Sequence, residues 1–126
     1  LLSRRQRQMC IRDRDKNYYV FVNVSSSEGI PVSIMEATSF GIPCIATDAG
    51  GTKEIISDKE NGVLLDRDAR TEIITASISK FCSMTDEEYR EYRRCSRERW
   101  ISKFNAKSNY EIYVTQLLKQ ISGDKE

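Results

Sequence analysis

The chain has 126 residues, 39% of them hydrophobic and 31% charged, and a formal net charge of +1, values that fit one soluble globular domain or a piece of a larger one. No run approaches the roughly 18 to 20 apolar residues of a membrane span, and no apolar segment of signal-peptide type stands at the front, so we expect a cytoplasmic protein. Histidine is absent, which excludes Ser-His and Cys-His nucleophiles and leaves Glu, Asp and backbone groups for any chemistry.

Residues 1–14 are predicted to be a leader foreign to the fold. They carry five arginines against one aspartate and show neither helical nor alternating apolar order. The segment resembles translated sequencing-adapter read-through, which is left out of fold reasoning; a basic arm for nucleic acid or anionic lipid is the alternative. Without these five positive charges and one negative charge the formal charge falls from +1 to −3, so we expect no binding of nucleic acid.

A β-α-β unit is predicted next. Residues 18–24 are β-branched and aromatic and run into three serines, as expected of a buried strand entering a loop. Pro31 suits the first position of a helix, and Gly41 suits the residue just past its end. Residues 42–46 form a second apolar run, whose proline is tolerated at a strand start. A right-handed crossover joins two parallel strands in such a unit.

The loops at the carboxyl ends of these strands, residues 25–30 and 47–52, form the usual ligand crevice of doubly wound folds. The helix that starts at Pro31 offers unpaired N–H groups and the positive end of its dipole, which together predict an anion site suited to a diphosphate. Glu36 could then hold a diol such as ribose, and Glu28 could face the group that the phosphate carries.

Two glycines, Gly50 and Gly51, add a second backbone-rich wall and permit close approach of a ligand. Each feature also has a purely structural explanation: Pro31 and Gly41 delimit a helix, Glu36 is solvated, and the glycine pair is a turn. Their convergence on one β-α-β unit favours a binding site. The four cysteines show no C-x-x-C pair, so we expect reduced cysteines, no metal site and no cofactor.

Residues 62–65 are predicted to form a further strand, and three helices follow. The first places Ile74, Ile78 and Phe81 on one face. The second begins with a capping box of Thr85 and Glu88, with Met84 and Tyr89 as its hydrophobic staple. The third aligns four apolar residues, Tyr110, Val114, Leu117 and Ile121. Arginines and glutamates alternate along the second helix, a pattern that predicts a solvated, ion-paired face.

The string SSSEGIPVSIMEATSFGIPCIATDAGGTKEII, residues 25–56, resembles the donor-site segment of the retaining glycosyltransferases of family-four type, which have the GT-B fold. Glu28 and Glu36 match the E-x7-E motif of that family. The resemblance implies an α/β fold: a partial Rossmann-like parallel sheet with flanking helices and a helical C-terminal tail, which is half of the second GT-B domain. We expect this partial nucleotide-sugar-binding domain over residues 15–121 and a disordered tail over 122–126.

The resemblance also implies roles for individual residues. Glu28 would be catalytic and would orient the donor sugar during a transfer that retains configuration, without a metal ion. The remaining expected site residues are the donor-binding positions Gly29, Ile30, Pro31, Val32, Glu36, Gly50, Gly51 and Thr52.

The partners implied are a nucleotide-sugar donor and a glycan or lipid-linked acceptor, in surface polysaccharide synthesis. The family holds its acceptor with a first domain that this chain lacks, so we expect the chain alone not to transfer sugar. A peripheral contact of the full-length protein with the inner face of the membrane stays open. Two alternatives also stay open: a non-catalytic α/β protein-interaction module, and a sugar-nucleotide epimerase of the same two-domain fold.

Overall fold

A computed structural model describes residues 19–123 of the chain. The predicted leader, residues 1–14, lies outside the described residues. Within them a parallel sheet has the strand order β1 (Phe21–Asn23), β2 (Cys44–Thr47), β3 (Gly62–Leu65). Every residue of the central strand β2 is buried, as expected of a parallel sheet covered on both faces. The expected β-α-β unit and the α/β class are thereby confirmed, but the expectation of a buried first strand is wrong: β1 lies at the edge of the described sheet, and its Val22 is 38% exposed.

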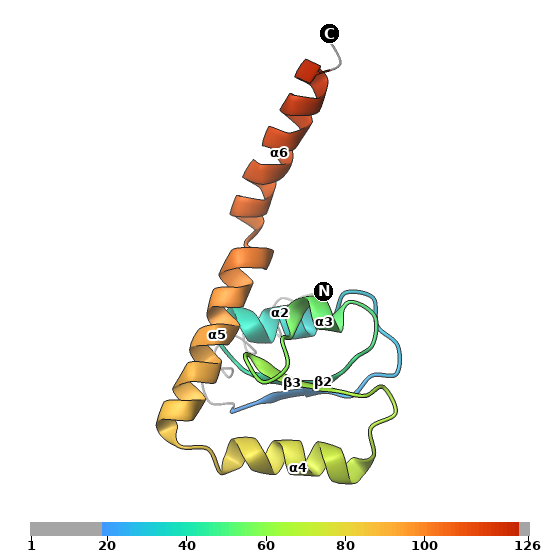
Figure 1. Ribbon diagram of the computed structural model, residues 1–126, viewed down its shortest axis with the longest axis vertical. Coiled ribbons are helices and arrows are strands. Elements are labelled where there is room, and N and C mark those ends of the chain that lie inside the picture. The colour runs from blue at the N-terminus through green and yellow to red at the C-terminus, as the bar shows by residue number, and fades with distance from the viewer. Residues whose placement is uncertain (1–18, 124–126) are drawn as a thin grey trace, which may run out of the picture.

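Helices cover both faces of the sheet. The helices α2 (Val32–Ser39) and α3 (Thr52–Ile55) lie on one face and α4 (Thr71–Cys82) on the other (Figure 1). Successive side chains of β2 alternate between the two cores: Cys44 packs in the cluster with the α2 side chain Ile34, and Ile45 packs with Phe81 of α4. The predicted apolar face of α4 is confirmed. The helix α3 was not predicted from the sequence, because one helical turn is too short to show a helical period.

The helix α5 (Asp86–Phe104) runs past the side of the sheet from α4 to α2, and α6 (Ala106–Gly123) continues away from the body of the domain (Figure 1). The predicted capping box begins α5: Glu88 N donates to Thr85 Oγ1 over 3.2 Å, and Thr85 N donates to Glu88 Oε2 over 2.9 Å. Met84 and Tyr89, at the positions predicted for a hydrophobic staple, both pack against the core on the α4 side.

The last helix, α6, has no buried residue in the described part of the chain. Its apolar side chains are exposed, Tyr110 by 70% and Ile121 by 62%. The helix reaches Gly123, two residues past the expected domain boundary at 121. None of the described helices is long and apolar enough to cross a membrane.

Three arginines of α5 bind the carbonyl groups at the C-terminal ends of α2 and α3, and we call them the arginine clamp: Arg93, Arg97 and Arg99. Arg93 Nε donates to Gly41 O over 3.2 Å, and Arg97 Nη1 donates to Ser39 O. Arg99 donates to Ile55 O over 2.6 Å and to Glu54 O over 3.1 Å. Helix C-termini carry unpaired carbonyls and the negative end of the dipole, so a cation there is favourable.

The predicted ion pairing on α5 is therefore wrong for the clamp arginines, whose partners are backbone carbonyls distant in sequence, while Arg93 and Arg97 are exposed as predicted. It is confirmed for Arg94, which pairs with Glu91 and with Glu98 on its own helix. The side chain of Arg90 also bonds within α5, because its Nε donates to the backbone carbonyl Asp86 O. Gly41 ends α2 as predicted, with φ +67°, a conformation that glycine adopts without strain.

Arg99→Ala should lower the free energy of unfolding by about 1 to 2 kcal/mol, because two carbonyls lose a charged donor. Arg90→Ala is the matched control, since among the described residues this arginine of the same helix bonds only to Asp86 O in its own turn; we expect a change within about 0.5 kcal/mol. Urea denaturation followed by circular dichroism measures both. Equal effects of the two substitutions would show that the clamp contributes nothing.

Candidate functional site

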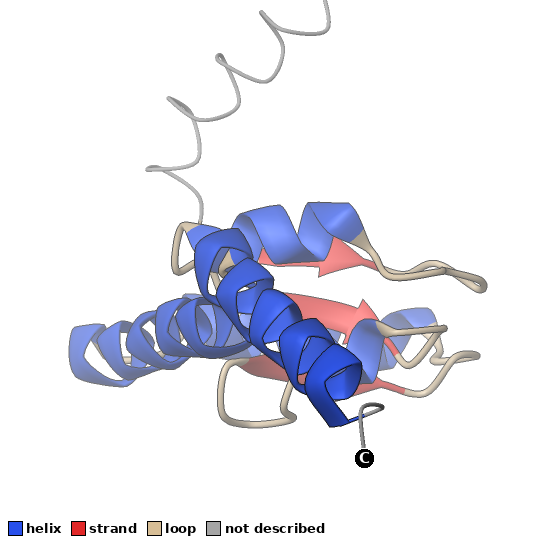
Figure 2. Ribbon diagram, turned by 90° about the horizontal axis from the view of Figure 1, so that it is seen from above, coloured by secondary structure: helices blue, strands red, loops and turns tan. Residues whose placement is uncertain are grey.

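The two loops that leave the carboxyl ends of β1 and β2 are bonded to each other. Gly51 N donates to Gly29 O over 2.7 Å, and Thr47 Oγ1 donates to Ser25 O over 2.5 Å. Figure 2 shows the strand arrows pointing toward one edge of the domain, where these loops emerge. Loops 25–30 and 47–52 therefore form one surface at the edge of the sheet, as the topology predicts.

Gly50 makes the close contact between the loops. Its φ is +55°, and a Cβ atom added to it would lie 1.9 Å from Glu28 O. A Cβ on Gly51 would lie 3.1 Å from the side chain of Ile30. The space beside both glycines is thus filled by the neighbouring loop, a structural role that the sequence analysis did not assign. Around Gly29, by contrast, a Cβ would meet no atom within 4 Å.

The first turn of α2 is open to solvent in the described structure. Pro31 is the residue that precedes the helix, not its first residue as predicted, and its carbonyl accepts from Ile34 N and Met35 N over 3.1 and 3.2 Å. The flanking side chains Ile30 and Val32 are 57% and 64% exposed. The amide groups of Val32 and Ser33 have no acceptor among the described residues. This end of α2 can therefore donate to an anion.

Glu28 lies half-buried at the same edge, between the two strands' loops. Its Oε1 accepts from Asn23 Nδ2 over 3.1 Å. Hydrogen bonding from the side chains of Ser25 and Asn23 holds the pKa of Glu28 below its ordinary value. The side chain is therefore a carboxylate at neutral pH, with lone pairs left to accept from a ligand.

Glu36 is exposed on α2, one helical turn after Val32 and on the same outer face. Side chains on a helix generally lean toward its N-terminus, which is the end that carries the open first turn. Thr52 is buried, and its Oγ1 donates to Ala49 O over 2.7 Å. Its hydroxyl thus supports the second loop from within the fold.

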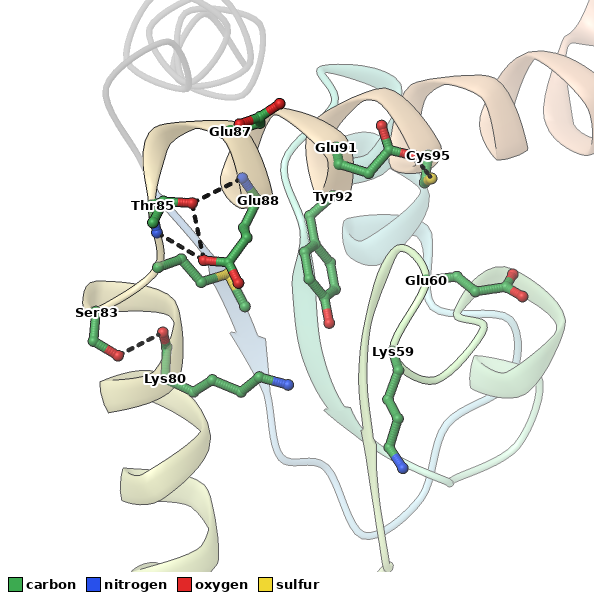
Figure 3. Close-up of a pocket in the computed structure, with 11 residues that line it drawn as sticks. Lys59, Glu60, Lys80, Ser83, Thr85, Glu87, Glu88, Glu91, Tyr92 and Cys95 are labelled. Atoms are coloured by element: carbon green, nitrogen blue, oxygen red, sulfur yellow. Dashed lines mark hydrogen bonds between the residues drawn. The ribbon is translucent and has the colours of Figure 1, made fainter.

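A groove of about 910 Å³ lies elsewhere, between the α4–α5 turn and the loop at Lys59 (Figure 3). The ring of Tyr92 points into it from α5. The groove is at the amino ends of the strands, because α4 runs back from the carboxyl end of β3. Of its four acidic groups, Glu88 is bonded in the capping box and Glu91 pairs with Arg94, while the side chains of Glu60 and Glu87 make no hydrogen bond or ion pair among the described residues. No group of His, Cys, Asp and Glu among the described residues could hold a metal ion.

Comparison with known proteins gives both a family and a fold. Residues 13–99 match the family described as "Glycosyl transferases group 1". The GtfA subunit of a UDP-N-acetylglucosamine–peptide N-acetylglucosaminyltransferase from Streptococcus gordonii is 29% identical over 111 residues, which are 85% of this chain and 22% of the relative. The Vi polysaccharide biosynthesis protein VipC/TviE of Salmonella typhi is 40% identical over 63 residues, which are 46% of this chain and 11% of the relative.

Among solved structures, sucrose-phosphate synthase from Thermosynechococcus elongatus matches with a TM-score of 0.76 at 22% identity, covering 91% of this chain and 28% of that chain. This likeness shows the fold, which is that of the C-terminal domain of GT-B glycosyltransferases. The chain spans less than a third of each of these proteins.

Gly50→Ala should destabilise the chain by more than about 2 kcal/mol, because a side chain at this positive φ must also displace the backbone at Glu28. Gly29→Ala is the matched control in the facing loop and should change stability by less than about 0.5 kcal/mol. Chemical denaturation measures the stability of both variants. Gly50→Ala with wild-type stability would show that the loops do not touch as described.

Proposed function

The chain belongs to the group 1 glycosyl transferases, and from this premise we propose that it forms the donor-binding part of a retaining glycosyltransferase that uses a nucleoside-diphosphate sugar. The observation that carries the proposal is the edge shared by the open first turn of α2 and the carboxylate of Glu28. A group that donates to anions and a group that accepts from hydroxyls stand side by side there. A sugar diphosphate presents both chemistries.

In this proposal the diphosphate binds the amide end of α2, where the N–H groups of Val32 and Ser33 and the helix dipole favour negative charge. The open backbone at Gly29 lets the phosphate approach closely. Glu36, one turn after Val32 on α2, accepts hydrogen bonds from the ribose hydroxyls. The contact between the loops at Gly50 keeps the second wall beside the first.

Glu28 acts on the sugar. Positive charge develops on the sugar as the diphosphate departs, and a fixed carboxylate stabilises such charge more than it stabilises the uncharged ground state. The bond from Asn23 occupies one oxygen of Glu28, so the remaining lone pairs are available to sugar hydroxyls. We assign Glu28 this orienting and electrostatic role rather than that of a covalent nucleophile, in a transfer that retains configuration.

The class of acceptor is inferred from the name of a related protein. VipC/TviE is named for polysaccharide biosynthesis, and we propose a glycan or lipid-linked acceptor in the synthesis of surface polysaccharide. Residues 15–121 would be a partial donor domain, and a first domain would bring the acceptor. A cytoplasmic location, with the full-length protein at the inner face of the membrane, belongs to the same proposal.

Nucleotide titration followed by NMR tests the proposal, with UDP, GDP and UDP-N-acetylglucosamine as probes. Glu36→Gln should weaken binding of nucleotide and nucleotide sugar alike by about tenfold, because it loses charged bonds to the ribose. Glu28→Gln should weaken only the nucleotide sugar. Glu111→Gln, on the exposed helix α6, is the control and should change neither. Absence of binding by the wild-type chain up to millimolar nucleotide would refute the donor site.

The proposed site uses amide donors in place of a metal ion, so addition of EDTA should leave nucleotide binding unchanged within error. The measurement is the same NMR titration, repeated with EDTA and then with added Mg²⁺. Binding that appears only with Mg²⁺ would show that the diphosphate reaches the chain as a metal complex.

A further inference from the structure

Asn23 is the last residue of β1, at the point where the strand passes into loop 25–30. Both ends of its half-buried amide are bonded. Its Oδ1 accepts from Ser25 N over 3.1 Å and from Ser25 Oγ over 2.7 Å, and its Nδ2 donates to Glu28 Oε1 over 3.1 Å. No role was assigned to this residue from the sequence, because an asparagine that ends a strand usually begins a turn.

The bonds to Ser25 determine which way the Asn23 amide faces. A backbone N–H can only donate, so the atom opposite Ser25 N must be the amide oxygen, and the amide nitrogen is left facing Glu28. Ser25 is itself held by Thr47, whose Oγ1 donates to Ser25 O, and Asn23 is paired with Ala46 of β2. The Asn23 amide nitrogen that donates to Glu28 is therefore held in place by the sheet as well as by loop 25–30.

We propose that Asn23 is a positioning residue for the donor sugar: its amide holds the Glu28 carboxylate in the orientation in which the remaining lone pairs accept from sugar hydroxyls. The inference rests on the proposed function of Glu28. It adds a second residue to the sugar subsite, one that acts through Glu28 and does not touch the nucleotide. Hydrogen bonds from Ser25, the larger cause, and from Asn23 lower the pKa of Glu28, so Asn23 contributes part of the stabilisation of this carboxylate.

Asn23→Asp separates this role from a merely structural one. An aspartate at this position still accepts from Ser25 N and Oγ, so the turn is kept, but it cannot donate to Glu28 and repels its charge. Asn105→Asp is the matched control: Asn105 Oδ1 accepts from Lys107 N over 3.1 Å at the start of α6, so the same change keeps an acceptor and lies outside the site. The NMR fingerprint spectrum shows whether each variant is folded.

Two measurements on the whole chain decide the question. The first is the pKa of the Glu28 carboxyl by ¹³C NMR titration, which should rise in Asn23→Asp and stay unchanged in Asn105→Asp. The second is binding of UDP compared with UDP-N-acetylglucosamine. Asn23→Asp should weaken binding of the nucleotide sugar by about tenfold and leave binding of UDP unchanged. In a Glu28→Gln background it should weaken the nucleotide sugar no further.

The outcomes separate the two proposals. If the wild-type chain binds neither probe, the donor site fails and the role of Asn23 in it fails too. If the wild-type chain binds and Asn23→Asp keeps wild-type affinity for the nucleotide sugar, only the positioning role is overturned. An Asn23→Asp variant that loses UDP and nucleotide sugar equally would likewise overturn it, since that pattern reports damage to the loop.

Discussion

The orientation of α2 is the constraint on which the candidate site depends. Its inner face, including Ile34, is buried against the sheet, and its C-terminal carbonyls are bound by Arg93 and Arg97 of α5. Only its N-terminal end is left open. Because one end of the helix is neutralised by fixed cations and the other is not, the positive end of the dipole is the part that remains for a ligand.

The amino and carboxyl ends of the strands also differ in the polar groups that they present to solvent. At the amino ends of the strands, two of the acidic groups that line the large groove have partners: Glu88 in the capping box and Glu91 with Arg94. At the carboxyl ends, the amides of Val32 and Ser33 have no acceptor among the described residues, and the Glu28 carboxylate keeps lone pairs that can accept from a ligand. The candidate site is therefore chosen by amide donors that stand beside a carboxylate, which bind a ligand at no cost in lost internal bonds.

The contact at Gly50 links the two halves of this edge. It brings the second loop onto the backbone of Glu28, while Asn23 holds the side chain of the same residue from the strand. Glu28 is thus constrained through both its backbone and its carboxylate. Preorganisation of this kind is what electrostatic stabilisation of a reacting sugar requires, since a carboxylate that must first reorient loses part of the energy it could supply.

The sequence by itself determined the features that depend on neighbours along the chain. The strands, the end of α2 at Gly41 and the capping box of Thr85 and Glu88 follow from local backbone preferences and side-chain periodicity, and the family follows from the string around Glu28. Tertiary structure alone decided which groups remained unpaired. The partners of Arg99 lie more than forty residues away, and the atom that excludes a side chain at Gly50 belongs to another loop; contacts of this kind depend on how the sheet brings distant segments together, and no local pattern encodes them.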